Sequence, residues 1–303
     1  MIYRFFYQLY LKTMGSSAHG AKLQAEEENW TPPRPCPEFE SADATATRHG
    51  DTYRGAAVLI GFLSILVVFI AIAPAGIQIE SESMLVALGI TKVGLMSFIL
   101  VHVYFFGVRS GHHGDWIQKR QVAESLRYVQ IKELKESLVK SLNSQDSVQC
   151  AFALFNEIKQ TLAGPGGQIA YNRRKSEQYK SIEHFGGQLS WYGFAFALLC
   201  AIWILLSELH LVPHTALMIF GTAAVPALVG GIHGINGLLK IEGLVEEHRK
   251  MASVLNGLNV ELNHVDVQDG AAILSIGERV YTILVDRDIQ WSESIEKIKI
   301  KPA

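Results

Sequence analysis

The sequence predicts an all-α integral membrane protein in which four transmembrane helices form two hairpins, with further helical segments in the cytoplasm. The main observation is that four long stretches of the 303 residues contain no Asp, Glu, Lys or Arg. They are Gly55–Ile79, Val93–Val108, Phe185–Ser207 and Leu209–Leu239. Because a helix rises about 1.5 Å per residue, roughly 20 apolar residues cross a bilayer core of about 30 Å. A charged content of only 18% beside 49% hydrophobic residues agrees with this class.

The chain divides into an N-terminal part and two similar halves. Residues 1–41 are expected to form a short amphipathic or docking helix and a proline-rich connector. Residues 42–163 hold the first hairpin, with spans at about 55–75 and 86–108 and cytoplasmic helices after them. A linker at 164–180 begins with the turn sequence Gly164-Pro165-Gly166-Gly167. Residues 181–303 hold the second hairpin, with spans at about 186–207 and 213–239 and C-terminal cytoplasmic helices.

The cytoplasmic segments are expected to be helical. Apolar residues recur at helical spacing over Asp115–Leu142, which contains neither Gly nor Pro. Two further helices are expected over Glu242–Leu262 and Ala271–Ile298, separated by a weak turn at Asn263–Gly270.

The distribution of cations predicts the orientation in the membrane. The two hairpin turns, Ala75–Leu85 and Glu208–Val212, contain no Lys or Arg, whereas the other polar segments are rich in both. Positive residues stay on the cytoplasmic side, so both termini and the central segment are expected there. We expect the first and third spans to be plain lipid-facing anchors, and the second and fourth to face protein or water.

The most specific local pattern follows the second span. Trp116, Arg120, Ala123, Glu124 and Arg127 are spaced so that they share one helix face, with Arg120–Glu124 and Glu124–Arg127 as adjacent pairs. Two interpretations are open. The face is either a salt-bridge network that packs helices below the membrane, or an arginine pair that contacts an anionic signal or a lipid headgroup.

Polar residues inside the second and fourth spans are the other candidates. Lys92 either snorkels to the headgroups or lines water, because a lysine at the centre of a span needs water or a partner. His102 and His233 form either ordinary hydrogen bonds between helices or a gate.

The fourth span also has the spacing of a close-packing helix. Gly230 and Gly234 form a GxxxG pair, and Pro226 is expected to kink the helix. This face either packs inside the subunit or belongs to a pore-lining or oligomer-facing helix.

Several function classes find no support in the sequence. A net charge of −2 makes bulk nucleic-acid binding unexpected, and the three cysteines have no metal-ligand spacing. The adjacent His112 and His113 lack the helical spacing of a metal pair. No G-x-S-x-G, H-E-x-x-H or Walker pattern is present, so we expect no catalytic residues, no cofactor and no enzyme.

The segment Ala42–Arg54, the hairpin after it and the pattern W-x3-R-x2-A-E-x-L-R beginning at Trp116 together resemble the bacterial SLATT family. These are two-transmembrane effector domains associated with SMODS nucleotidyltransferases and SLOG sensor domains. The second half is similar, with Tyr179, His184 and Trp191 before a hairpin and a terminal helix from Glu278 to Trp291. The resemblance covers roughly Ala42 to Ser294, as two tandem hairpins where one is the basic unit.

The resemblance implies a homo-oligomeric pore or ion channel in the bacterial inner membrane, acting in nucleotide-signalled anti-phage defence by abortive infection. It also implies a nucleotide second messenger or a separate sensor protein as partner, beside the lipid bilayer. Two other functions are compatible with the residues. One is a non-conducting scaffold that tethers a partner through its cytoplasmic helices, and the other is a small-solute transporter.

Overall fold

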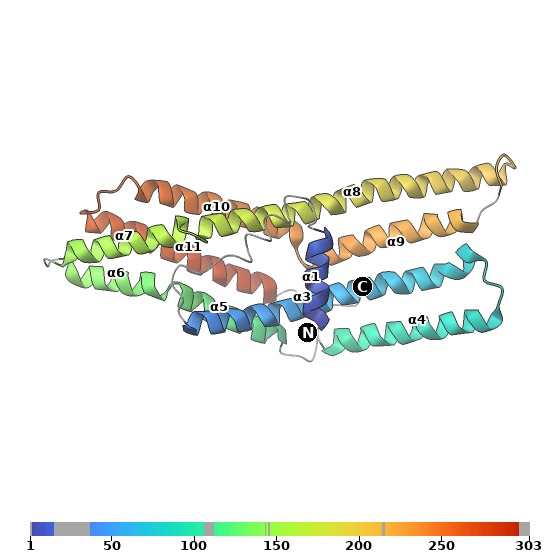
Figure 1. Ribbon diagram of the computed structural model, residues 1–303, viewed down its shortest axis with the longest axis horizontal. Helices are drawn as coiled ribbons and strands as arrows, with labels where there is room; N and C mark the ends of the chain where they lie inside the picture. The colour runs from blue at the N-terminus through green and yellow to red at the C-terminus, as the bar shows by residue number, and fades with distance from the viewer. Residues whose placement is uncertain are drawn as a thin grey trace.

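The computed structural model describes residues 2–14, 37–105, 112–142, 144, 146–213 and 216–296. Within these residues every regular element is helical (Figure 1), which confirms the predicted all-α fold. Four helices are long and apolar enough to cross a membrane, so the chain is a multi-pass membrane protein by length and composition.

Two helices of 41 residues form the frame of the molecule: α3 (Pro37–Ile77) and α8 (Gln168–Glu208). At 1.5 Å per residue each is about 60 Å long, roughly twice the thickness of a bilayer core. α4 (Glu82–Val103) runs back beside α3, and α9 (Ala216–Leu238) runs back beside α8. Figure 1 shows these four helices side by side at one end of the molecule. We call this end the membrane half.

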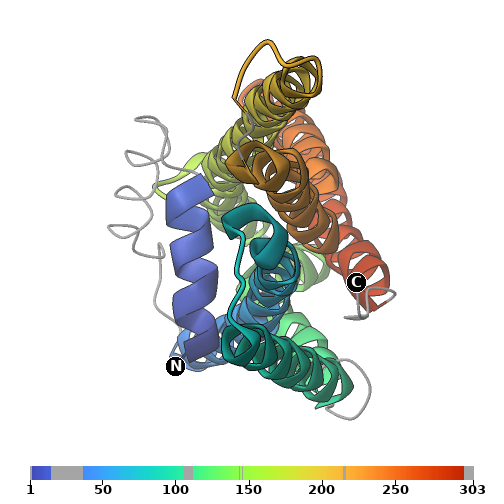
Figure 2. The same cartoon turned by 90° about the vertical axis from the view of Figure 1, so that its right-hand side faces the viewer.

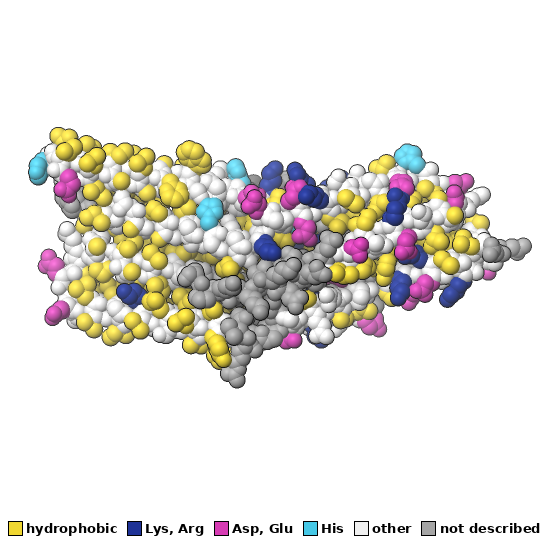
Figure 3. All heavy atoms as spheres, turned by 180° about the vertical axis from the view of Figure 1, so that it is seen from behind, with side chains coloured by type: hydrophobic (Ala, Val, Ile, Leu, Met, Phe, Trp, Pro, Cys, Tyr) yellow, Lys and Arg dark blue, Asp and Glu magenta, His cyan; other side chains and the backbone are white. Residues whose placement is uncertain are grey.

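The other end, the extramembrane half, contains the first parts of α3 and α8 and the remaining long-axis helices. These are α5 (His112–Arg127), α6 (Val129–Ser141), α7 (Ser147–Ala163), α10 (Ile241–Leu262) and α11 (Gly270–Glu296). Charged side chains gather on this half in the space-filling view (Figure 3). Its core is mainly aliphatic, and Leu154, Leu255 and Ile273 have no exposed surface. Burial of each such side chain stabilises the folded state by about 1.5–3 kcal/mol.

Local sequence explains where the long helices begin and end. α3 starts with Pro37, whose missing N–H costs nothing in a first helical turn, and Glu38 and Glu40 complement the helix dipole there. α8 begins after a turn in which Gly166 has a φ of 73°, a value that favours glycine. Lys240 adopts a φ of 52° and bends the chain between α9 and α10.

The two hairpins pack against each other through α3 and α9. A Cβ atom on Gly61 of α3 would overlap Ile235 of α9, and one on Gly231 of α9 would overlap Ile65 of α3. Each helix therefore places an isoleucine over a glycine of the other. Small residues at such contacts let helix backbones approach closely, which is the main source of attraction between helices in lipid.

The short helix α1 (Ile2–Met14) lies across the other helices at the boundary between the two halves (Figures 1 and 2). It packs on α3 and α8, with Tyr7, Tyr10 and Met14 buried. A Cβ atom on Gly55 would overlap the carbonyl oxygen of Tyr3. Only glycine therefore allows α1 to cross α3 at this point.

Several boundaries differ from the sequence-based expectation. Residues 168–180, expected as part of a linker, form the beginning of α8, because the break is confined to the glycine-rich turn before them. The second span was expected from about 86, but α4 already begins at Glu82. The helix expected over Asp115–Leu142 is interrupted at Tyr128, which separates α5 from α6. The proline-rich connector and residues 106–108 lie outside the described residues.

The environments of the spans also differ from the expectation. α3 was expected to be a plain lipid-facing anchor, but its apolar segment has the largest buried share of the four, 28%. α4 has the smallest, 6%, because it packs chiefly on α3. α3 is more buried because its glycines let other helices pack closely on several of its sides.

Candidate functional site

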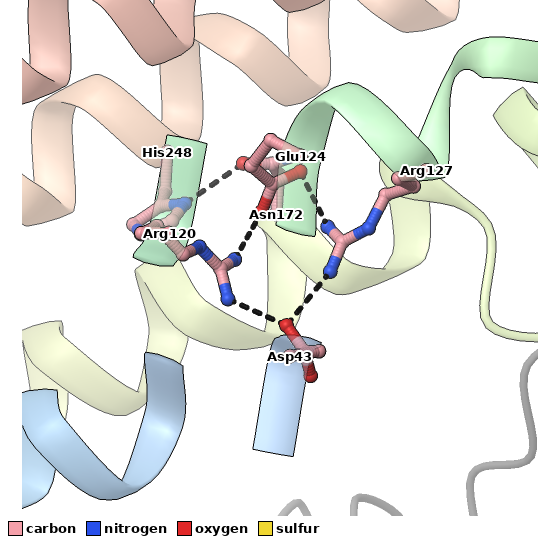
Figure 4. A network of polar contacts seen from close by, with 6 residues as sticks. All are labelled: Asp43, Arg120, Glu124, Arg127, Asn172 and His248. Atoms are coloured by element: carbon pink, nitrogen blue, oxygen red, sulfur yellow. Dashed lines mark hydrogen bonds and ion pairs between the residues drawn. The ribbon is translucent and has the colours of Figure 1, made fainter. Parts of the chain in front are cut away.

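Four charged side chains close into a ring between α3 and α5 (Figure 4). Arg120 and Arg127 each contact both Asp43 of α3 and Glu124 of α5. Arg120 Nη1 lies 2.8 Å from Asp43 Oδ1, and Arg127 Nη1 lies 3.1 Å from Glu124 Oε2. The arginines and Glu124 are one helical turn apart on α5, as their spacing predicted. Asp43 is the member that the sequence pattern did not include.

Electrostatics hold this ring in its ionised form. Burial opposes ionisation of Glu124, but the adjacent Arg127 and Arg120 guanidinium groups outweigh it and lower the pKa of Glu124 below its usual value. Both positive charges are matched by carboxylates of the same chain. In this conformation the arginine pair is therefore occupied by internal partners, and the ring joins α5 firmly to the beginning of α3.

Trp116 lies on the same face of α5 and is buried against α3. Its ring stacks on Tyr53 with centroids 5.8 Å apart, and the Arg54 guanidinium lies 5.0 Å from its centroid. A Cβ atom at Gly50 would lie 2.5 Å from Trp116 Nε1, so the absence of a side chain there makes room for the indole. Trp116 thus anchors α5 to α3 just beyond the ring.

A buried polar pair joins α8 to α10 beside the ring (Figure 4). Asn172 Nδ2 donates to the carbonyl of Gln168, so its Oδ1 accepts, and His248 Nδ1 donates to it at 2.8 Å. Burial, followed by the charges of Arg287 and Lys175, lowers the pKa of His248 to about 3. His248 is therefore neutral at physiological pH. Sequence reasoning missed this pair because both residues look like ordinary polar positions of surface helices.

Three tyrosines of α1 connect it to helices of both hairpins. The Tyr3 hydroxyl lies 2.9 Å from His102 Nε2 of α4, and Tyr7 Oη accepts from Arg54 of α3 at 3.2 Å. The Tyr10 hydroxyl donates to the side-chain oxygen of Asn236 in α9. Spacings of 4 and 3 along α1 place the tyrosines on one face, a signal that the sequence did contain.

The remaining predicted residues lie in the membrane half, away from the ring. His102 bonds Tyr3 of α1, and His233 bonds Ser190 of α8, so each histidine has its own partner. Lys92 is half-buried at the middle of α4. Pro226 is inside α9, which remains helical on both sides of it.

The glycines of the GxxxG pair do not pack on any other helix that the structure describes. Cβ atoms on Gly230 and Gly234 would meet no atom within 4 Å, whereas the neighbouring Gly231 packs on α3. The surface formed by Gly230, His233, Gly234 and Gly237, all exposed, is called here the open face of α9.

The arrangement is a mechanical junction rather than a site with reactive groups. The ring, the tryptophan stack and the His248–Asn172 pair join the extramembrane helices to α3 and α8, which continue into the membrane half. The fold and the site together define the class of protein: a four-span α-helical membrane protein whose extramembrane helices are joined to its long helices by ion pairs, ring stacking and hydrogen bonds. Comparisons with protein-family models, curated proteins and solved structures found no match to this chain.

Replacement of Glu124 by Gln tests the ring. The change leaves two arginines beside a single carboxylate, and breaking a buried ion pair costs about 3–5 kcal/mol. Because both arginines are partly exposed, we expect the free energy of unfolding to fall by about 2–3 kcal/mol. In detergent the melting temperature should then be lower by about 5–10 °C. The control is Glu246→Gln, which removes an ion pair with Arg249 on the exposed surface and should leave the melting temperature unchanged. Equal effects of the two changes would contradict the ring's structural role.

The His248–Asn172 pair predicts an acid-sensitive fold. Between pH 6.5 and about 3 the unfolded chain binds a proton at His248 that the folded chain does not, so stability falls as the pH decreases. The loss is about 1.4 kcal/mol per pH unit in this window. Melting curves from pH 7.5 to 5 should therefore be less pH-dependent for His248→Gln than for the unchanged chain. The exposed His264→Gln should behave like the unchanged chain, and matching curves for all three would contradict the prediction.

Proposed function

We propose that this protein is a homo-oligomeric membrane pore in which α4 and the open face of α9 meet other subunits or water. The observation that carries the proposal is Lys92. Within the described residues it has no hydrogen-bond or ion-pair partner, although it lies in the middle of an apolar helix.

The depth of Lys92 argues against snorkelling. α1 crosses the bundle where Tyr3 bonds His102, so this level marks one boundary of the membrane half. Lys92 is ten residues from His102 and ten from Glu82 at the other end of α4, or about 15 Å from each. A lysine side chain reaches less than half of that distance. A charge at the bilayer centre costs about 2.5–3.5 kcal/mol, and water or a neighbouring subunit removes that cost.

The exposure of α4 and α9 supports an oligomer. α4 is covered by little except α3, and its large apolar side chains Ile90, Val93 and Leu100 are 59–68% exposed. The open face of α9 has the small-residue character of helix contacts in lipid, and among the described residues its three glycines have no neighbour within 4 Å. A second subunit would supply both missing contacts.

The extramembrane helices supply a means of control. The ring and α1 join them to α3, α4 and α9, so a movement of the extramembrane half is transmitted to the spans. A ligand or partner would need to favour the open arrangement by a few kcal/mol. From the resemblance to SLATT domains we propose that the trigger is a nucleotide signal or a separate sensor, in bacterial anti-phage defence.

The orientation belongs to the same proposal. All extramembrane helices lie at one end of the molecule, and that end carries most of the charged side chains (Figures 1 and 3). The excess of Lys and Arg there supports a cytoplasmic location for this half and for both termini, in the bacterial inner membrane.

A non-conducting scaffold is the second candidate, and an exposed apolar surface favours it. Val139 and Leu142 of the α6 end and Val148 and Phe152 of α7 are each 41–55% exposed at the far end of the extramembrane half. A partner protein would bury these side chains. A scaffold needs no polar residue within the spans, however, and leaves Lys92 unexplained.

Replacement of Lys92 by Glu tests the pore. In planar bilayers the unchanged protein should conduct with a preference for anions, and Lys92→Glu should shift the reversal potential towards cation preference. Lys119→Glu makes the same charge change at an exposed position of α5 and should leave selectivity unchanged. A scaffold predicts no conductance, and inducible expression would then leave the signal of a membrane-potential dye unaltered.

The open face of α9 predicts where subunits meet. Gly230→Leu together with Gly234→Leu should weaken self-association at least tenfold, or about 1.4 kcal/mol, measured by mass photometry in detergent. Gly187→Leu is the matched control, because Gly187 is an exposed glycine of α8 that also faces open space. An unchanged distribution of oligomers in the double variant would rule out this face as the contact.

A further inference from the structure

The helix α1 has three distinct faces, and two of them are accounted for by contacts. The first, with Tyr3, Tyr7, Tyr10 and Met14, is directed into the bundle. The second, with Arg4 and Gln8, is directed towards the extramembrane half. Its direction follows from Asp51 of α3, which Arg4 approaches at 3.3 Å and Gln8 hydrogen-bonds.

The position of Asp51 fixes this direction. α1 crosses α3 at Gly55, and Asp51 precedes Gly55 by one helical turn, or about 6 Å towards the beginning of α3. The beginning of α3 belongs to the extramembrane half. The polar face of α1 is therefore turned away from the spans.

The third face is apolar and uncovered. Ile2, Phe5 and Leu9 are exposed by 64%, 60% and 44%. A helix turns about 100° per residue, which places this stripe about 110° from the Arg4 and Gln8 side and about 140° from the tyrosine face. The stripe therefore faces away from both the bundle and the extramembrane half. It is directed outward and towards the level of the membrane.

The apolar stripe is continuous with the surface of the spans. Phe6 is half-buried between the stripe and the tyrosine face and packs on the core shared by α1, α3, α8 and α9. The Tyr3–His102 bond places the beginning of α1 beside the end of α4, where Phe98 and Val101 are exposed by 44% and 51%. α1 contains no acidic residue; Arg4 pairs with Asp51, and the exposed Lys12 suits anionic headgroups.

We propose that α1 is a membrane-surface helix that binds lipid: Ile2, Phe5 and Leu9 enter the acyl boundary of the leaflet next to the extramembrane half, and the exposed Lys12 meets anionic headgroups. The geometry is that of an in-plane amphipathic helix, with its apolar face about 5–10 Å below the headgroup level. The three tyrosines fix α1 to both hairpins. α1 would thus contact the bundle with its tyrosine face and lipid with its apolar stripe. This lipid site does not depend on conduction through a pore.

The test measures the depth of single spin labels in the full chain. Cys36, Cys150 and Cys200 are replaced by Ala, and one cysteine is introduced as Phe5→Cys, Leu9→Cys, Gln8→Cys or Val148→Cys. The proteins are reconstituted in vesicles of phosphatidylcholine and phosphatidylglycerol at roughly 3:1, which supply anionic headgroups. Accessibility to oxygen, which concentrates in lipid, is compared with accessibility to a water-soluble nickel chelate.

Labels at positions 5 and 9 should be reached by oxygen and shielded from nickel, at a depth of about 5–10 Å below the phosphates. Labels at 8 and 148 should show the opposite pattern, because Gln8 is on the polar face and Val148 is an exposed apolar residue of the extramembrane half. Nickel accessibility at 5 and 9 equal to that at 148 would overturn the proposal, since the stripe would then face water. Shielding from both reagents would overturn it too, since a protein surface would then cover the stripe.

A second measurement keeps the native cysteines. A photoreactive benzoylphenylalanine at position 5 of the full chain should form adducts with lipid, identified by mass, and the same group at position 8 should not. Adducts at position 5 with a second copy of the chain, and none with lipid, would refute the proposal. Neither measurement requires conduction, so the lipid site and the proposed pore fail or succeed separately.

Discussion

Close approach to the small residues of α3 is the constraint on which the rest of the structure depends. Gly50 admits the indole of Trp116, Gly55 admits the backbone of α1, and Gly61 admits Ile235 of α9. These three contacts are made by three different helices, and they follow one another along α3. In lipid, where no hydrophobic force drives helices together, such close packing is what selects the partner and the register. A side chain at any of the three positions would separate α3 from one of its neighbours.

The two halves of the molecule are stabilised by different forces, and polar contacts at the junction fix how they are aligned. The extramembrane half buries aliphatic side chains such as Leu154 and Leu255 away from water. The membrane half leaves most of its apolar surface exposed and satisfies its backbone within each helix. Between them lie directional polar contacts: the ring around Glu124, the His248–Asn172 pair and the tyrosines of α1. Because such contacts lose most of their energy when displaced by a few ångströms, they fix how the two halves are aligned.

Among the described residues, some charged groups of the protein have partners in the subunit and others do not. Arg120 and Arg127 have carboxylate partners in the subunit, so they act as fastening points, and any anionic ligand would have to displace Asp43 or Glu124. In the part of the chain that the structure describes, Lys92 has no such partner, and Gly230, Gly234 and Gly237 of the open face have no neighbour within 4 Å. Exposed apolar side chains and glycines that face open space lie on α4, α9 and α1. The groups left without a partner in the described residues therefore belong to the spans and not to the arginine pair.

The sequence by itself determined the all-α class, the four apolar helices and the face shared by Trp116, Arg120, Glu124 and Arg127, because these depend on local composition and on the helical repeat. It also suggested the docking character of the first 14 residues. The tertiary structure decided which helices touch. Periodicity does not reveal that Asp43 closes the ring from 77 residues away, that Gly231 and not Gly230 packs on α3, or that Lys92 is central in its helix. Each of these depends on the rotation and offset of one helix relative to another, and a repeat within one helix contains no information about either.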